Sequence, residues 1–324
     1  MKRVSFLLAI FLSLSLHAEL EIRTQVVMGT FATIKLSSSD KLLFHNTFTI
    51  LKRVDNSLSS YKKNSPVYKL NRDKKASINL YTYEALTLSQ KYYAQSGGYF
   101  NIAIGSITKD LYHFGEDERS PKNWEFNVSD TSFSTLSFDK LSAELGQGVK
   151  IDLGGFGKGY GVDRAVEYLR VNGVENGSVA LSGDIRCLGV CEMLINNPFS
   201  DEALASFMTT QGDIGVSTSG NYNRFVDSVK HNHLINPKTK TSQQNFISIT
   251  LISTLQNSDL DAYATAASVM PKELAYRFLN SLDVGYIIME ESHKVVVSEN
   301  IEKFCKNLYV DTRSKKYPEY VDDK

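Results

Sequence analysis

The sequence predicts one compact mixed α/β (α+β) domain that follows an N-terminal export signal. The chain has 324 residues, of which 42% are hydrophobic and 22% charged, so it can bury a core of ordinary globular composition. Segments with strand-like alternation and segments with helical spacing follow one another along the chain. No linker, repeat or low-complexity tract interrupts them. We therefore expect a single domain over residues 19–324.

The N-terminus has the three parts of a secretory signal peptide. Two basic residues precede a largely apolar stretch from Val4 to Leu16, and Ala18 ends a cleavage-like site. The apolar stretch is too short for a comfortable membrane-spanning helix. We expect residues 1–18 to be removed and the mature protein to be soluble and periplasmic, without a lipid anchor because no cysteine lies near the cleavage site. The alternative is a buried first helix or an uncleaved anchor.

Residue spacing assigns the elements of the mature chain. The predicted helices span residues 38–57, 81–97, 157–172, 259–270 and 272–282. The predicted strands are two pieces of 21–36 separated at Met28-Gly29-Thr30, followed by 149–153, 178–182, 193–196, 213–217, 246–255, 284–289 and 293–297. Residues 115–140 are polar and irregular, which is typical of a loop.

The charge balance excludes one class of partner. Lys and Arg total 36, and so do Asp and Glu, so the net charge is zero. A chain without basic excess lacks the electrostatic footprint of a non-specific nucleic-acid-binding protein. We therefore expect no nucleic-acid partner.

The three cysteines leave their pairing open. Cys187 and Cys191 flank a Leu-Gly-Val turn, whereas Cys305 stands alone. On one straight strand, residues four apart lie roughly 13 Å from each other, which is too far for a disulfide. On the two sides of a hairpin they could meet. The sequence is equally compatible with a disulfide and with three unpaired cysteines.

The densest group of chemistry-bearing residues is IDLGGFGKGYGVD at 151–163. Its five glycines follow a predicted strand and lead into a predicted helix, where backbone N–H groups can approach a phosphate closely. Lys158 adds a positive charge, and Asp152 and Asp163 can accept hydrogen bonds from a ribose, a base or a ring imide. The pattern matches neither the P-loop nor the dinucleotide-binding fingerprint. Alone, such a turn is as often structural as ligand-binding.

Two further segments carry side chains suited to catalysis. Asp261 and Thr265 are four residues apart and share one helical face, which suits Mg²⁺. Spacing alone favours the alternative that Asp259 or Asp261 caps the helix. His233, in HNHLINPKT, has the side chain best suited to proton transfer near neutral pH, although a lone histidine is more often structural.

Taken in order, these motifs resemble those of the ApbE family, the FAD:protein FMN transferases. The resemblance covers about residues 25–290. Its eight segments are Met28-Gly29-Thr30, Ser59-Ser60-Tyr61 with Ser65 and Leu70-Asn71, Gly98 to Gly105, Asp152 to Asp163, Ser182 to Ile185, Ser219 to Tyr222, His233 to Pro237, and Asp261 to Ala266. Where the family pattern has Asp, Gly, Asp and Gly, this chain has Asn101, Ser182, Asn236 and Lys240.

The resemblance implies a T-fold-related domain that transfers the FMN half of FAD to a Thr or Ser hydroxyl of a target protein and releases AMP. It implies Mg²⁺ held by Asp261, Thr265 and the Gly155 carbonyl, with His233 as the base and Asp261 as the second catalytic residue. The implied FAD contacts are Met28, Tyr61, Ile102, Ala103, Ile104, Asp152, Lys158 and Ile235.

The resemblance also implies a class of partner. The expected targets are exported flavin-carrying subunits of Rnf- or Nqr-type electron-transport complexes, which would bring the protein near a membrane surface. Two other functions fit the same residues. One is a Mg²⁺-dependent FAD pyrophosphatase, in which water replaces the protein hydroxyl, and the other is a periplasmic flavin-binding protein without turnover.

Overall fold

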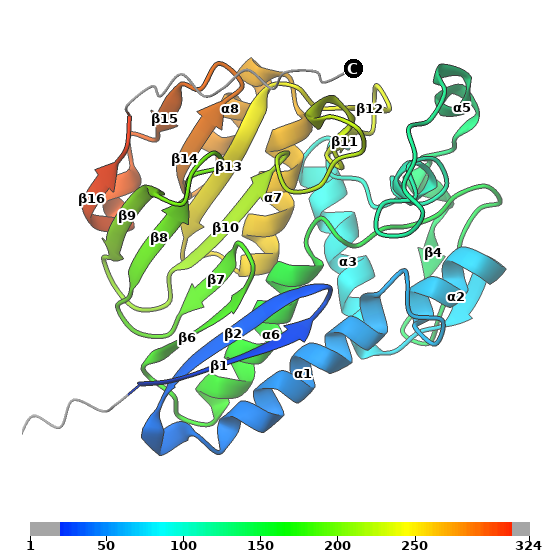
Figure 1. Cartoon of the computed structure of the whole chain (residues 1–324). Helices are drawn as coiled ribbons and strands as arrows, with labels where there is room; N and C mark the ends of the chain where they lie inside the picture. The colour runs from blue at the N-terminus through cyan, green and yellow to red at the C-terminus, as the bar shows by residue number, and fades with distance from the viewer. Residues whose placement is uncertain (1–19, 313–324) are drawn as a thin grey trace, which may run out of the picture.

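An eight-stranded antiparallel sheet forms the centre of the computed structural model, which describes residues 20–312 (Figure 1). The strand order is β1-β2-β6-β7-β10-β13-β14-β15. The strands span Leu20–Val27 (β1), Thr30–Ser37 (β2), Gly177–Leu181 (β6), Asp184–Cys187 (β7), Gly215–Gly220 (β10), Phe246–Ser253 (β13), Gly285–Glu290 (β14) and Val295–Val297 (β15). The predicted signal peptide at 1–18 lies outside the described residues.

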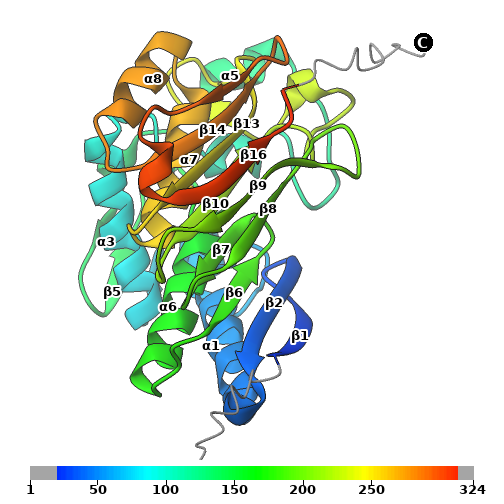
Figure 2. The same ribbon diagram turned by 90° about the vertical axis from the view of Figure 1, so that its left-hand side faces the viewer.

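Helices cover one face of this sheet, and a second sheet covers part of the other face (Figure 2). The helices are α1 (Leu43–Leu58), α6 (Gly157–Val171) and α7 (Asn257–Val269), with α3 (Leu80–Gln95) and α8 (Lys272–Asn280) packed against α7. The second sheet has the order β16-β9-β8 and consists of Cys305–Val310, Ala203–Thr209 and Glu192–Asn196. Its buried residues Met193 and Ile195 pack with Val216 and Ile287 of the large sheet.

A third group of short elements lies beside α1 and α3, away from the large sheet (Figure 1). It contains α2 (Pro66–Asp73), α4 (Gly105–Thr108), α5 (Asn123–Val128) and a small sheet of β3 (Lys75–Ser77), β5 (Ser142–Glu144) and β4 (Ser137–Phe138). A two-stranded ribbon, β11 (Ile235–Asn236) and β12 (Thr241–Ser242), follows later in the chain. No helix of the described residues is long and apolar enough to span a bilayer.

The mixed α/β prediction is confirmed, and so are most of its elements. Four helices and the strands around the Met-Gly-Thr break lie where spacing placed them. The helix predicted from residue 38 begins later, at Leu43, because Ser38–Asp40 form a 3₁₀ turn capped by Ser37. Residue spacing missed α2, α5, β7, β9 and β16.

The strand predicted at 149–153 is wrong. Lys150 makes only an isolated bridge to Ile104. The backbone groups of Ile151 bind the side chain of Asn71 instead, which accepts from its N–H at 2.7 Å and donates to its carbonyl at 2.8 Å. The segment is therefore extended without belonging to a sheet, and it leads directly into the glycine turn.

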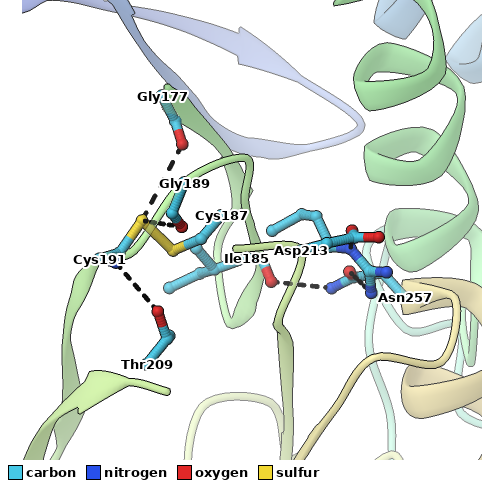
Figure 3. The surroundings of a disulfide bond; sticks show 9 residues. Gly177, Ile185, Cys187, Gly189, Cys191, Thr209, Asp213 and Asn257 are labelled. Carbon is cyan, nitrogen blue, oxygen red and sulfur yellow. Dashed lines mark hydrogen bonds and ion pairs between the residues drawn. A yellow bond between two sulfur atoms is a disulfide. The ribbon is translucent and has the colours of Figure 1, made fainter. Parts of the chain in front are cut away.

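The structure shows a disulfide between Cys187 and Cys191 (Figure 3). Cys187 ends β7 and Cys191 precedes β8, and their Cα atoms are 6.1 Å apart. The backbone N–H of Cys191 donates to Thr209 Oγ1 of β9 at 3.0 Å. The crosslink thus joins the large sheet to the second sheet, while Cys305 is buried and unpaired.

Candidate active site

A cavity of about 1260 Å³ lies where the tips of the large sheet meet the third group of elements. Its wall comes from segments far apart in the sequence, including the β1–β2 turn, the glycine turn, the β6–β7 turn, β10 and α7. The residues predicted from sequence that line it are Met28, Tyr61, Ile102, Ile104, Asp152, Gly155, Lys158, His233, Ile235, Asp261 and Thr265.

Two residues that the sequence predicts to contact a cofactor, Ala103 and Asp163, do not line this cavity. Ala103 is 1% exposed, and its N–H already donates to Asn101 Oδ1 at 2.9 Å. Asp163 is also buried, and both of its carboxylate oxygens accept from the N-terminus of α7, from the N–H groups of Asn257 and Ser258. The expectation of a cofactor hydrogen bond to Asp163 is therefore wrong, because Asp163 is buried against the start of α7 and does not line the cavity.

Gly155, Asp261 and Thr265 bring three oxygen-bearing groups to the cavity wall. The Thr265 hydroxyl donates to the Gly155 carbonyl at 3.0 Å, which joins the glycine turn to α7. Asp261 lies one turn before Thr265 on the same helix and is 2% exposed. Among the described residues, no group of three or more His, Cys, Asp or Glu side chains surrounds a metal position. An oxygen-only set with one carboxylate suits Mg²⁺, which keeps water and phosphate oxygens as its other ligands.

The capping alternative for the two acids of α7 is wrong. The helix begins at Asn257 after Gln256, and neither Asp259 nor Asp261 caps it. Asp259 binds Lys91 of α3 at 2.6 Å. Burial, with the nearby Asp184 adding to it, raises the pKa of Asp261 above its ordinary value. Because burial and Asp184 disfavour the ionised form of Asp261, a nearby cation stabilises its carboxylate.

Lys158, near the start of α6, supplies such a cation. Its ammonium lies 2.9 Å from Asp184 Oδ2 and 3.2 Å from Asp261 Oδ2. Gly159 allows α6 to pack closely against α7, because a Cβ at this position would lie 2.3 Å from the Asn257 carbonyl oxygen. The N–H of Gly159 also donates to Asp261 at 3.1 Å.

Asp152 is fixed on the opposite side of the glycine turn. It accepts from Thr108 Oγ1 and from the Gly154 N–H, both at 2.9 Å, and it lies 3.3 Å from the Lys109 ammonium. Burial alone would raise the pKa of Asp152, but Lys109 and these hydrogen bonds outweigh it and lower the pKa to about 2. Asp152 is therefore an ionised acceptor at neutral pH.

Tyr61 is held at the cavity wall by two cations that residue spacing did not identify. Its hydroxyl donates to the Phe114 carbonyl at 2.6 Å and accepts from Arg224 Nη2 at 2.8 Å. The Lys109 ammonium lies 3.8 Å from the ring centroid. The ring is 39% exposed, so it offers an aromatic surface to a flat ligand. Arg224 lies two residues after the Ser-Gly-Asn-Tyr motif, and this closeness is the signal that could have identified it.

His233 is oriented by the backbone of the same arginine. Its Nδ1 lies 3.0 Å from the Arg224 carbonyl, which can only accept, so Nδ1 carries the proton and Nε2 is the acceptor. Burial lowers the pKa of His233 to about 4, and the Arg224 guanidinium adds to the effect. The imidazole is neutral at physiological pH.

Comparison with known proteins agrees with this architecture. A model of the ApbE family matches residues 28–288. The FAD:protein FMN transferases of Vibrio cholerae and Klebsiella pneumoniae are 25% and 26% identical, over 86% and 84% of this chain and 90% of each relative. The crystal structure of the Thermotoga maritima ApbE protein superposes with a TM-score of 0.79 at 24% identity, covering 89% of this chain and all of that one. The Vibrio cholerae flavin transferase ApbE gives a TM-score of 0.78 at 22% identity, over 89% and 99% of the two chains. Since the family model spans most of the sequence and the fold agrees, the chain belongs to the ApbE family.

Proposed function

We propose that this protein is a Mg²⁺-dependent FAD:protein FMN transferase. The proposal rests chiefly on one observation: the oxygen ligands of Gly155, Asp261 and Thr265 line the same cavity as Lys158 and His233. One cavity therefore offers a place for a divalent ion, a cation for phosphate and a proton acceptor. The two relatives named above carry the same activity in their names, which supports the proposal.

The size of the cavity supports a large substrate. Typical small-molecule sites have roughly 300–1,000 Å³, and this cavity has about 1260 Å³. That space suits a dinucleotide together with the acceptor residue of another protein. Tyr61 offers an aromatic surface for a ring, while Asp152 offers an ionised acceptor for N–H or O–H groups of the ligand.

The proposed reaction is a displacement at phosphorus. The oxygen of a Thr or Ser hydroxyl on the target forms a new bond to the phosphorus of the FMN half, and the pyrophosphate bond to AMP breaks. AMP leaves with the bridging oxygen, and the hydroxyl proton passes to a base. Positioning and charge neutralisation supply most of the catalysis in such reactions.

Each residue of the chain has a distinct part in this scheme. Asp261, Thr265 and the Gly155 carbonyl would hold Mg²⁺, which when bound neutralises charge on the pyrophosphate and its leaving group. Lys158 adds a second positive charge beside the phosphates. His233 presents an unprotonated Nε2 as the base for the target hydroxyl, and the negative charge of bound phosphates would raise its basicity.

We further propose that the protein is exported and acts on an exported flavin-carrying subunit of an Rnf- or Nqr-type complex, near a membrane surface. The signal-like pattern of residues 1–18 supports export. The Cys187–Cys191 disulfide supports it independently, because disulfides persist mainly in oxidising compartments.

The test is incubation of the protein with FAD, Mg²⁺ and a candidate acceptor, followed by mass spectrometry of the acceptor. The proposal expects a gain of one FMN on a Thr or Ser and release of AMP, both absent with Asp261→Ala. Formation of free FMN and AMP without any acceptor-bound flavin would instead identify a FAD pyrophosphatase. Bound FAD without any product would identify a flavin-binding protein.

A further inference from the structure

Asp184, the first residue of β7, is a buried carboxylate beside the candidate metal site to which the scheme above gives no part. It is 0% exposed. Its Oδ1 accepts from the Ser217 hydroxyl at 2.6 Å. Its Oδ2 lies 2.9 Å from the Lys158 ammonium. The charge of Asp184 is therefore offset by Lys158.

Lys158 is shared between this carboxylate and a proposed metal ligand. The same ammonium lies 3.2 Å from Asp261 Oδ2, so it bridges β7 and α7 from its place on α6. Two carboxylates at these distances favour the charged ammonium, so Lys158 is a cation in the site.

This arrangement creates a conflict when a metal binds. A divalent ion at Asp261 and an ammonium on the same carboxylate repel each other, and the protein interior screens that repulsion far less than water does. The metal therefore requires Lys158 to leave Asp261. Without another anion, the displaced ammonium would stand unpaired at the cavity wall, where the Lys158 side chain is only 28% exposed.

We propose that Asp184 is a positioning residue that retains the Lys158 ammonium when Asp261 turns to the metal. The inference rests on the Mg²⁺ site of the proposed function. In the metal-free protein, the single positive charge of Lys158 is shared between the two carboxylates. In the metal-bound protein, Asp184 alone keeps Lys158, so its ammonium remains beside the phosphates without weakening the metal site.

The test measures metal binding in the absence of FAD, with Mn²⁺ as the probe and its free electron paramagnetic resonance signal as the readout. In Asp184→Asn, the ammonium has only Asp261 as a charged partner and competes fully with the metal. Loss of an outer-shell partner typically weakens metal affinity by about 10–100-fold, and we expect a loss in this range. Circular dichroism and thermal unfolding establish that the variant is folded.

Removal of the competing cation distinguishes positioning from a structural role. Lys158→Met should bind Mn²⁺ more tightly than the wild type, because nothing competes for Asp261. The double variant Asp184→Asn/Lys158→Met also lacks the competing ammonium, so it should bind Mn²⁺ at least as tightly as the wild type. A merely structural defect at Asp184 would persist in the double variant.

A matched control replaces a buried, lysine-paired acid remote from the cavity. Glu290 of β14 is 3% exposed and lies 2.5 Å from Lys272 Nζ, so Glu290→Gln should leave Mn²⁺ affinity unchanged. If wild-type protein binds Mn²⁺ and Asp184→Asn binds it equally well, or if the double variant stays weak, the inference on Asp184 is wrong while the metal site stands. If the wild type binds no Mn²⁺, the metal site and the inference both fail.

Discussion

Asp163 of α6 fixes the start of α7 through Asn257. One carboxylate oxygen accepts from the backbone N–H of Asn257 at 2.8 Å, and the other accepts from that of Ser258 at 2.9 Å. No residue of α7 itself provides a side-chain cap. The helix that carries two of the proposed metal ligands is thus capped by a residue about 95 positions away, on the helix that carries Lys158.

Asp163→Ala should destabilise the fold by about 2 kcal/mol or more, because two buried N–H groups lose their acceptors. Unfolding in urea, followed by circular dichroism, measures the change. The control is Asp73→Ala, which removes an exposed pair with Arg72 and should change stability by at most about 0.5 kcal/mol. Equal stability of Asp163→Ala and the wild type would contradict the capping role.

The disulfide gives a prediction that thiol counting can check. The chain has three cysteines, and the structure pairs Cys187 with Cys191 and leaves Cys305 free. Unfolded without reductant, each chain should therefore react with one equivalent of a thiol reagent, and after reduction with three. Three reactive thiols in unreduced protein purified from an oxidising compartment would contradict the pairing.

Local spacing recovered the long helices and strands, because their apolar faces repeat along the chain. It failed at 149–153, where alternating apolar and charged residues resemble a strand, but the backbone groups of Ile151 bind the side chain of Asn71, about 80 residues earlier. It also missed β7, in which a buried charge, Arg186, interrupts the apolar pattern and is offset by Asp213 at 2.8 Å. Both failures arise from contacts between distant residues that no local pattern contains.

At the candidate site, too, local motifs were predictable from the sequence, whereas contacts between distant residues were not. The ordered motifs identified the glycine turn, Asp261, Thr265 and His233, because each lies in a short recognisable segment. Asp184 also lies in one of these segments, but its pairing with Lys158, like the contact of Arg224 with His233, became evident only when the fold brought the residues together.

Two departures from the family pattern lie at positions where the backbone favours glycine. Ser182 and Lys240 replace glycines, and both have left-handed backbones, with φ of 54° and 61°. A side chain in this region costs energy that glycine avoids. Lys240 offsets part of that cost, because its ammonium donates to the carbonyls of Phe126 and Ser129 at 3.2 and 2.7 Å.

Asp261→Ala should abolish FMN transfer and leave the protein folded. The variant loses its only proposed carboxylate ligand for Mg²⁺, but Lys158 keeps Asp184 as its partner at 2.9 Å. Acceptor-bound flavin, measured by in-gel fluorescence, should fall to background, as it should when a chelator is added to the wild type. Transfer that survives either treatment would remove the metal from the mechanism.

The low pKa of His233 predicts how stability depends on pH. The folded-state pKa of about 4 lies below the ordinary value of about 6.5. The unfolded chain therefore binds more protons between these two values, so stability contributed by the neutral imidazole is complete above about pH 6.5 and declines toward pH 4. In urea unfolding across this range, His233→Gln should show a smaller acid loss than the wild type. Identical pH profiles would show that His233 titrates normally.

His233→Ala should bind FAD but transfer FMN poorly, because the variant lacks the proton acceptor while the ligand-binding wall remains. Loss of a general base typically lowers the rate by about 10²–10⁴-fold. Lys158→Ala provides the contrast, since deletion of a charge beside the phosphates should weaken FAD binding instead. Flavin fluorescence titration gives each affinity, and transfer is then measured at saturating FAD. Normal transfer by saturated His233→Ala would make His233 structural, with its Nδ1 bond to the Arg224 carbonyl as its role.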